Sequence, residues 1–160
     1  MKIKTQIIFL ITIPVFIGII INIIKPKSLP WVAEPILLIK NQNDLSAILS
    51  EPEIREIGLS VAFNLHNDGT LFVDAREEEY IKEGFITGAI YDDDIEVLAA
   101  KIDTLVGLDR PFVIYCSDDD CGSSEDLAYN LQDWGFMNIL VFKGGWKMWT
   151  ESGYQVQENE

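Results

Sequence analysis

The sequence predicts an α/β domain with a largely parallel sheet, preceded by one N-terminal transmembrane helix. Segments of strand length alternate with segments of helical periodicity through most of residues 36–160. Two of the strand-like segments, "FVIY" at 112–115 and "NILVF" at 138–142, are apolar almost throughout, as in strands covered on both faces. Near the N-terminus, the 20 residues 5–24 carry no charge, a length that can cross a hydrocarbon core of ~30 Å.

The N-terminal segment "TQIIFLITIPVFIGIIINII" predicts a membrane anchor within residues 1–27. A cleavable signal peptide is the alternative, but its apolar region is usually shorter and ends at a small-residue cleavage site, which is missing here. Lys2 and Lys4 favour an N-terminus on the inside. We therefore expect a single-pass protein of a bacterial-type inner or plasma membrane, with its domain outside the cytoplasm, or in the periplasm of a Gram-negative cell. Two cysteines can persist there as a disulfide.

The elements follow in order after a proline-containing linker at residues 28–35. "ILLI" at 36–39 reads as a short strand, and Asn43 or Asp44 as the start of a helical region. Apolar residues at 54, 57, 61 and 65 keep helical spacing, so one or two helices are expected, with a break at Pro52. "HNDGT" at 66–70 predicts a turn.

The second half repeats the alternation more clearly. Strands are expected at 71–76, 88–91, 109–116 and 138–142. Short or amphipathic helices are expected at 77–84, 92–107, 123–135 and 144–153. Asp92, Asp93 and Asp94 suit a helix N-terminus. Ser123, with Asp126 three residues later, fits a capping box.

The charge of the chain excludes some classes of partner. The net charge is −14, and all 26 acidic residues lie from Glu34 onward. The part after Lys27 holds eight basic residues and therefore carries −18. Such a surface repels nucleic acid and anionic headgroups, and it disfavours small anionic substrates unless a pocket reverses the field.

The stretch "VIYCSDDDCGSS", from Val113 to Ser124, places Cys116 at the end of a predicted buried strand. In an open parallel sheet, ligands bind outside the carboxyl ends of the strands. The following helix N-terminus would stabilise a thiolate or persulfide on Cys116. The alternative is that Cys116 is a small buried hydrophobic residue that ends a strand.

Three segments together resemble a rhodanese-like domain: "VDAREEEYIKEGFITGAI", "VIYC" with its loop and helix, and "GFMNILVFKGGWKMWTESGYQV". The resemblance covers about 71–156, with weaker agreement back to Ile36. It implies a parallel five-stranded sheet flanked by helices, and a sulfurtransferase that carries sulfane sulfur as a persulfide on Cys116. Its partners would be a sulfane-sulfur donor and a thiol acceptor, and no cofactor or metal is implied. The closest resemblance is to a membrane-anchored subgroup with a two-cysteine loop.

The loop departs from the family pattern. It is longer than usual and has no basic residue, and the residues around the two cysteines are Ser117, Asp118, Asp119, Asp120, Gly122 and Ser123. Two unit charges 4 Å apart interact by ~1 kcal/mol in water and ~4 kcal/mol at an effective dielectric of 20. Aspartates facing the thiol would therefore oppose the thiolate, whereas aspartates facing solvent would leave the amide cradle dominant. "EGFI" also has Phe85 where the family has histidine.

Cys121 follows Cys116 with four residues between them. As a resolving thiol, it would attack a Cys116 persulfide and release sulfide. It could instead form a static structural bridge, or the two cysteines could remain unlinked. Metal binding by the loop is a weaker interpretation, because closed zinc sites need four ligands.

Arg76 and His66 are two further candidates for a structural or functional role. Arg76, in the motif Asp74-x-Arg76, is expected to hold acidic neighbours at a strand end through a bidentate pair, or else to help an anion enter. His66 is expected at the surface rather than as a catalytic base. Three functions follow from the sequence: a membrane-tethered sulfur carrier, a dithiol–disulfide redox module using Cys116 and Cys121, and a catalytically inactive interaction domain.

Overall fold

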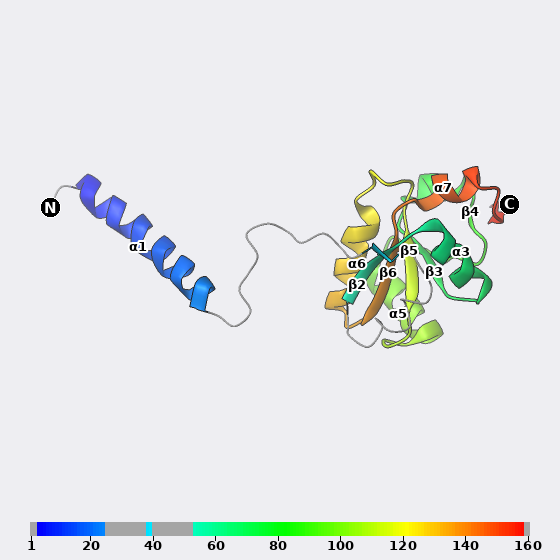
Figure 1. Cartoon of the computed structure of the whole chain (residues 1–160), viewed down its shortest axis with the longest axis horizontal. Helices are drawn as coiled ribbons and strands as arrows, with labels where there is room; N and C mark the ends of the chain where they lie inside the picture. Colours follow the sequence, from blue (N-terminus) through cyan, green and yellow to red (C-terminus); the bar gives the residue numbers. More distant parts are fainter. Residues whose placement is uncertain (1–2, 25–37, 40–52, 159–160) are drawn as a thin grey trace. The chain divides into compact units, whose positions relative to one another are not determined.

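A computed structural model of the chain describes residues 3–24, 38–39 and 53–158 (Figure 1). The chain divides into two units, residues 1–35 and 36–160. The predicted linker and the helical region expected at Asn43 or Asp44 lie outside the described residues.

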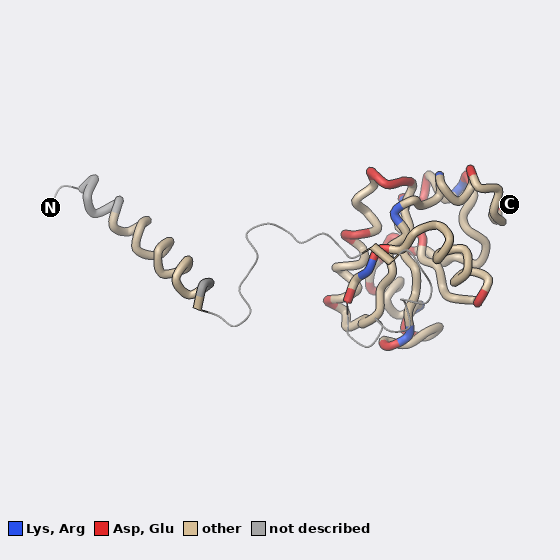
Figure 2. Tube along the Cα trace, in the orientation of Figure 1, with Lys and Arg blue, Asp and Glu red and all other residues tan. Residues whose placement is uncertain are grey.

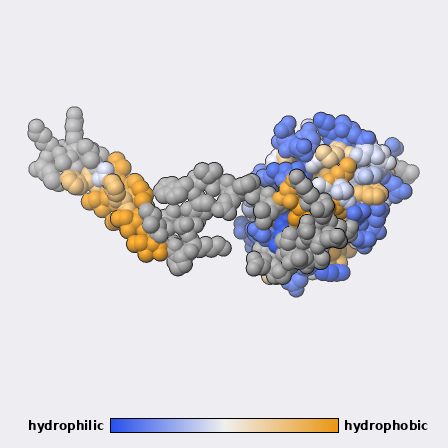
Figure 3. Space-filling view, in the orientation of Figure 1, coloured by the Kyte–Doolittle hydropathy of each residue, from blue (hydrophilic) through white to orange (hydrophobic). Residues whose placement is uncertain are grey.

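The first unit contains helix α1 (Ile3–Ile24), which confirms the predicted helical conformation of this segment. Figure 3 shows hydrophobic residues along its described part. Among the described residues, no helix combines the length and the apolar character needed to cross a membrane.

The second unit is built on a five-stranded sheet in which every strand pair is parallel. The spatial order is β1-β2-β6-β5-β3. These strands are β1 (Leu38–Ile39), β2 (Glu53–Ile57), β3 (Phe72–Asp74), β5 (Phe112–Tyr115) and β6 (Asn138–Phe142). The apolar strands β5 and β6 lie inside the sheet, so the predicted α/β class and the two central strands are confirmed.

Helices cover both faces of this sheet (Figure 1). On one face lie α3 (Leu59–Asn67) and α7 (Gly145–Glu151), and on the other lie α5 (Ile95–Val106) and α6 (Ser123–Asp133). A short helix, α4 (Glu78–Ile81), follows β3 in the chain. Side chains alternate along β5, so that Val113 and Tyr115 pack in one core with α3 and α7. Phe112 and Ile114 pack in a second core with α5 and α6.

The helix expected across residues 54–65 is wrong in its first part. Glu53–Ile57 forms β2, and α3 begins only at Leu59, after Gly58. The spacing of Ile54 and Ile57 fits a short helix, but β2 pairs with β1 and β6 on its two sides. Pairing within a sheet outweighs so short a periodic signal.

The strand expected at 88–91 is reduced to one bridge between Val73 and Ile90. Gly88 turns the chain with a φ of 79°, and α5 begins soon afterwards at Ile95, so only Ile90 aligns with β3. β4 (Phe85–Ile86) and β7 (Val156–Gln157) form a small antiparallel sheet, for which the sequence gives no local signal.

The predicted N-terminus of α5 is confirmed, whereas the predicted capping box of α6 is wrong. Asp94 caps α5, because its carboxylate accepts hydrogen bonds from the N–H groups of Glu96 and Val97 at 2.9 and 3.3 Å. The capping box at Ser123 is wrong: Ser123 is the first residue of α6, and Gly122 precedes it without a side-chain cap.

Candidate active site

Cys116 directly follows β5 at the carboxyl edge of the sheet, and only 2% of its surface is exposed. The loop 117–122 then leads into α6. The predicted placement of the thiol between a central strand and a helix N-terminus is therefore confirmed. This edge is where open α/β sheets bind their ligands.

The structure joins Cys116 and Cys121 in a disulfide, with Cα atoms 6.2 Å apart. This separation lies within the usual range for a disulfide. The loop thus folds back on itself, and the bond closes a ring that contains Ser117 and the three aspartates. A resolving thiol and a static bridge both agree with this arrangement, and unlinked thiols do not describe this state.

Backbone hydrogen bonds attach the ring to α7. The N–H of Trp146 donates to the carbonyl oxygen of Cys116 at 2.8 Å, and the N–H of Lys147 donates to that of Ser117 at 2.9 Å. Within the ring, the N–H of Cys121 donates to the carbonyl of Asp118 at 3.2 Å. The start of the loop is therefore positioned by main-chain atoms.

The aspartates of the ring line a pocket of about 330 Å³ together with residues around α7. The lining residues are Asp118, Asp119, Asp120, Gly144, Lys147, Met148 and Glu151. Asp119 and Asp120 are exposed, whereas Asp118 is half-buried and its carboxylate accepts from the N–H of Asp120 at 3.2 Å. Figure 2 shows the acidic run along this loop. The pocket is thus lined by four carboxylates and one ammonium group.

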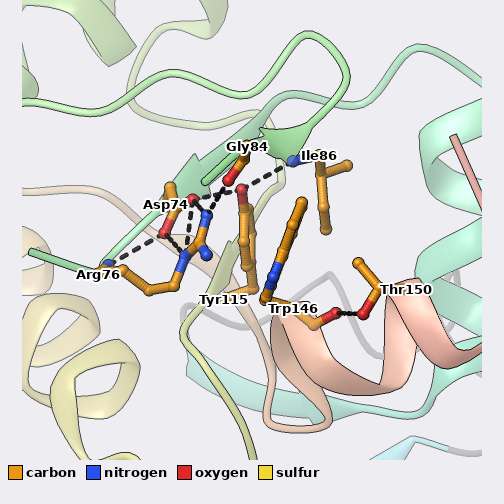
Figure 4. A network of polar contacts seen from close by, with 7 residues as sticks. All are labelled: Asp74, Arg76, Gly84, Ile86, Tyr115, Trp146 and Thr150. Carbon is orange, nitrogen blue, oxygen red and sulfur yellow. Dashed lines mark hydrogen bonds and ion pairs between the residues drawn. The ribbon is translucent and has the colours of Figure 1, made fainter. Parts of the chain in front are cut away.

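A second buried structure, the Asp74–Arg76–Tyr115 network, lies beside β5 (Figure 4). The Arg76 guanidinium forms a bidentate pair with Asp74, at 3.0 Å from Nε to Oδ1 and 2.6 Å from Nη2 to Oδ2. Nη2 also donates to the carbonyl of Gly84 at 2.7 Å, and the Trp146 ring lies 4.5 Å from the guanidinium carbon. Both charged side chains are at most 1% exposed. The structural interpretation of Arg76 fits this geometry.

Tyr115 completes the network and was not singled out in the sequence. Its hydroxyl donates to Asp74 Oδ2 at 2.6 Å and accepts from the N–H of Ile86 at 3.1 Å. Burial raises the pKa of Tyr115 well above its usual value, and the negative charge of Asp74 raises it further. Burial alone would lower the pKa of Arg76, but its hydrogen bonds to Asp74 and the charge of Asp74 raise it overall. A tyrosine at the end of an apolar strand gives no sequence signal beyond core packing.

His66 is part of the core boundary rather than a free surface residue. It lies in the last turn of α3, and its Nε2 is 2.8 Å from the carbonyl oxygen of Thr87. Its ring meets those of Phe72 and Trp149 edge-on. The predicted turn begins only after α3, so the expected surface position of His66 is corrected to a half-buried one.

Lys143, which directly follows β6, forms ion pairs with Glu125 in the first turn of α6 and with Glu56 at 3.7 Å. Hydrogen bonding to Glu125 raises the pKa of Lys143. The positive charge of Lys143 is thus paired with the carboxylates of Glu125 and Glu56. Within the part of the chain that the structure describes, no three His, Cys, Asp or Glu side chains are grouped so as to hold a metal ion.

A family model described as "Rhodanese-like domain" matches residues 60–152. The chain belongs to the rhodanese-like family. It is 31% identical over 109 residues to thiosulfate sulfurtransferase GlpE of Pseudomonas entomophila, covering 67% of this chain and 96% of that protein. It is 29% identical over 97 residues to the GlpE of Pseudomonas fluorescens, covering 61% of this chain and 85% of that protein.

Two solved structures share its fold. The rhodanese-related protein of Thermoplasma volcanium matches with a TM-score of 0.50 and 26% identity, covering 66% of this chain and 99% of that one. A protein from Bacillus halodurans matches with a TM-score of 0.55 and 18% identity, covering 72% of this chain and 82% of that one. Family membership and the two GlpE relatives support sulfurtransferase activity at the level of the family.

Proposed function

We propose that this rhodanese-like domain carries sulfane sulfur on Cys116 and transfers it to a thiol acceptor. The observation that supports this role is the position of Cys116 at the carboxyl end of β5, directly before the loop that leads into α6. The first N–H groups of a helix have no partner within it, so those of Ser123 and Ser124 can stabilise a negatively charged sulfur nearby.

The transfer begins from the reduced form of the loop. The Cys116 thiolate attacks the outer sulfur of a donor, a new S–S bond forms, and the donor's leaving group departs with the electron pair of the broken bond. Cys116 then holds a persulfide. An acceptor thiolate attacks the outer sulfur in turn, takes it as its own persulfide, and returns Cys116 to the thiolate.

The Cys116 persulfide can also react with Cys121 in place of an external acceptor. The Cys121 thiolate attacks the inner sulfur, at Cys116, and the outer sulfur leaves as hydrosulfide. The two cysteine thiols are thereby oxidised to the disulfide, and the sulfane sulfur is reduced by two electrons. A Cys116–Cys121 disulfide, the bond present in this structure, is the product that this step would leave. Two thiols, or one dithiol, supply the electrons that reopen the ring.

The same disulfide favours a second candidate function, dithiol–disulfide exchange with a partner and without sulfur transfer. Both functions use a disulfide between Cys116 and Cys121, whose Cα atoms lie 6.2 Å apart. They differ in whether a sulfur atom is bound to Cys116 during the cycle.

Intact mass spectrometry of the full chain distinguishes the two. The protein is reduced, freed of reductant and treated with a polysulfide donor. Under the sulfur-carrier proposal, Cys121→Ser retains one added sulfur atom, and the unsubstituted chain releases sulfide and loses two hydrogens. Cys116→Ser should gain none. A Cys116→Ser chain that still gains one sulfur, or a Cys121→Ser chain that gains none, would contradict the proposal.

We also propose that residues 5–24 attach the domain to a membrane, with the domain on the extracytoplasmic side. This proposal rests on the sequence, because the 20 residues of the segment carry no charge. Extraction of cell membranes with alkaline carbonate tests it: the full chain should stay in the pellet, and a chain that starts at Ser28 should not. Equal release of both chains would contradict membrane attachment.

A further inference from the structure

The contact between α7 and the Cys116 loop leaves no room for a side chain at Gly145. A Cβ added to Gly145 would overlap the carbonyl oxygen of Cys116 and would lie 3.0 Å from the carbonyl carbons of Cys116 and Ser117. All of these neighbours are backbone atoms, which cannot move aside as the end of a flexible side chain can. Gly145 also has a φ of 55°, in the region that favours glycine.

This close approach brings the backbone of α7 into hydrogen-bonding range of the loop. The two residues after Gly145 donate to Cys116 and Ser117 at 2.8 and 2.9 Å. Three consecutive residues of α7 therefore fix the first two peptide groups that follow the Cys116 side chain.

The orientation of those peptide groups determines where their N–H groups point. In a planar trans peptide, the C=O and N–H bonds point in opposite directions. Since the carbonyls of Cys116 and Ser117 face α7, the N–H groups of Ser117 and Asp118 face away from α7. In the described part of the chain, neither N–H donates to any acceptor. Both are thus free to donate to a negatively charged sulfur at Cys116.

We infer that Gly145 is a positioning residue for the chemistry of Cys116. By permitting the backbone contact, it turns the carbonyls of Cys116 and Ser117 onto α7 and leaves the N–H groups of Ser117 and Asp118 for the thiolate or persulfide. The inference rests on the proposed function, in which that sulfur is the reacting atom. Gly145 itself touches no reacting atom, and its effect passes through the loop.

Because the loop is negatively charged, the stability of a thiolate or persulfide on Cys116 depends on the orientation of these N–H groups. Asp118, Asp119 and Asp120 raise the free energy of a negative sulfur, whereas N–H dipoles aimed at it lower that free energy. The loop contains no cationic side chain that could replace them. Loss of the docked orientation should therefore raise the pKa of the Cys116 thiol and slow its reactions at neutral pH.

Gly145→Ala and its matched control, Gly153→Ala, test the inference. Gly153 has a φ of 72°, but a Cβ there would meet nothing within 4 Å. Both alanines impose the same type of backbone strain, and only the one at 145 overlaps the loop. Each is made in a full chain that also carries Cys121→Ser, so that Cys116 is the only thiol, and the rate of alkylation by iodoacetamide is measured against pH.

We expect Gly145→Ala to move the midpoint of the profile upward by one pH unit or more, which corresponds to about tenfold slower alkylation at neutral pH. Gly153→Ala should change that rate by less than twofold. An unmoved profile in Gly145→Ala, or an equal shift in both variants, would overturn the inference. A role in stability alone would lower the melting temperature without moving the profile.

A second measurement needs no substitution at Gly145, and it tests the positioning role even if Gly145→Ala does not fold. In the reduced Cys121→Ser chain, hydrogen exchange by NMR should show protected N–H groups at Trp146 and Lys147. The N–H resonances of Ser117 and Asp118 should titrate together with Cys116. Unprotected N–H groups at 146 and 147 would overturn the inference. A failure of sulfur uptake in the mass experiment, with the pH profile shifted as expected, would remove the proposed function and leave the positioning role intact.

Discussion

Tyr115 donates a hydrogen bond of 2.6 Å to the carboxylate of Asp74, and both side chains are buried. This bond joins the last residue of β5 to the last residue of β3. Because Cys116 follows Tyr115 in the chain, the network fixes the strand end from which the reactive loop begins. The network therefore couples the stability of the domain to the position of the thiol.

Arg76→Ala should lower the free energy of unfolding by about 3–5 kcal/mol, because it leaves the buried Asp74 carboxylate without its ionic partner. Urea unfolding at neutral pH measures the change. Lys82→Ala is the control, since Lys82 pairs with Glu78 on the exposed surface and its loss should change little. Equal losses in the two variants would contradict a structural role for the buried pair.

Stability should fall at alkaline pH. The pKa of Tyr115 is raised in the folded state, so the folded protein holds this proton after the unfolded chain has lost it. Its contribution is complete below about pH 10, the unfolded pKa, and is lost as the pH rises towards the folded pKa. Unfolding experiments between pH 8 and 11 should show this decline. The decline should be shallower in Tyr115→Phe, and an identical slope in that variant would contradict the prediction.

Small thiols of different charge should reduce the Cys116–Cys121 disulfide at different rates. After correction for thiolate concentration, cysteamine should react fastest, 2-mercaptoethanol more slowly and 3-mercaptopropionate slowest, because the adjoining pocket is acidic. The spread should be severalfold at low salt and should narrow at high salt. Stopped-flow kinetics measures the rate of reduction by each thiol, and the rate of the same thiol with a neutral small-molecule disulfide serves as the reference.

Two variants separate the local charge from the overall charge in that experiment. Asp119→Asn should narrow the spread among the three thiols, because Asp119 lines the pocket. Asp103→Asn removes the same charge from the exposed side of α5, away from the pocket lining, and should leave the spread unchanged. If 3-mercaptopropionate reacted as fast as cysteamine at low salt, the acidic residues would have no influence on access.

The sequence predicted the elements whose signal is local and strong. β6 occupies Asn138–Phe142, as its apolar run indicated, and α5 begins after Asp94, the last of three aspartates. β2 was missed because Ile54 and Ile57 have helical spacing, whereas in the strand they face opposite sides of the sheet and pack in different cores. Only the pairing of β2 with β1 and β6 makes this segment a strand. β4 was missed because its partner, β7, lies about 70 residues later in the sequence.

In the candidate active site, too, the residues within local motifs could be predicted, and those that act through distant contacts could not. Cys116 and Cys121 are recognisable because a thiol at the end of an apolar strand is a local pattern, and the bidentate pair of Arg76 with Asp74 lies within one short motif. Tyr115 and Gly145 act through residues far away in the chain, namely Asp74 for the first and Cys116 for the second. No local spacing encodes such contacts, so only the folded structure identifies them.

The attachment of the loop to α7 has a consequence for protein engineering. The contacts that hold its start use the carbonyl oxygens of Cys116 and Ser117, which every amino acid possesses. The side chains at 118–120 can therefore be exchanged without removing the anchor. This domain should tolerate grafted loops of other charge, so that its selectivity could be redesigned while its scaffold stays unchanged.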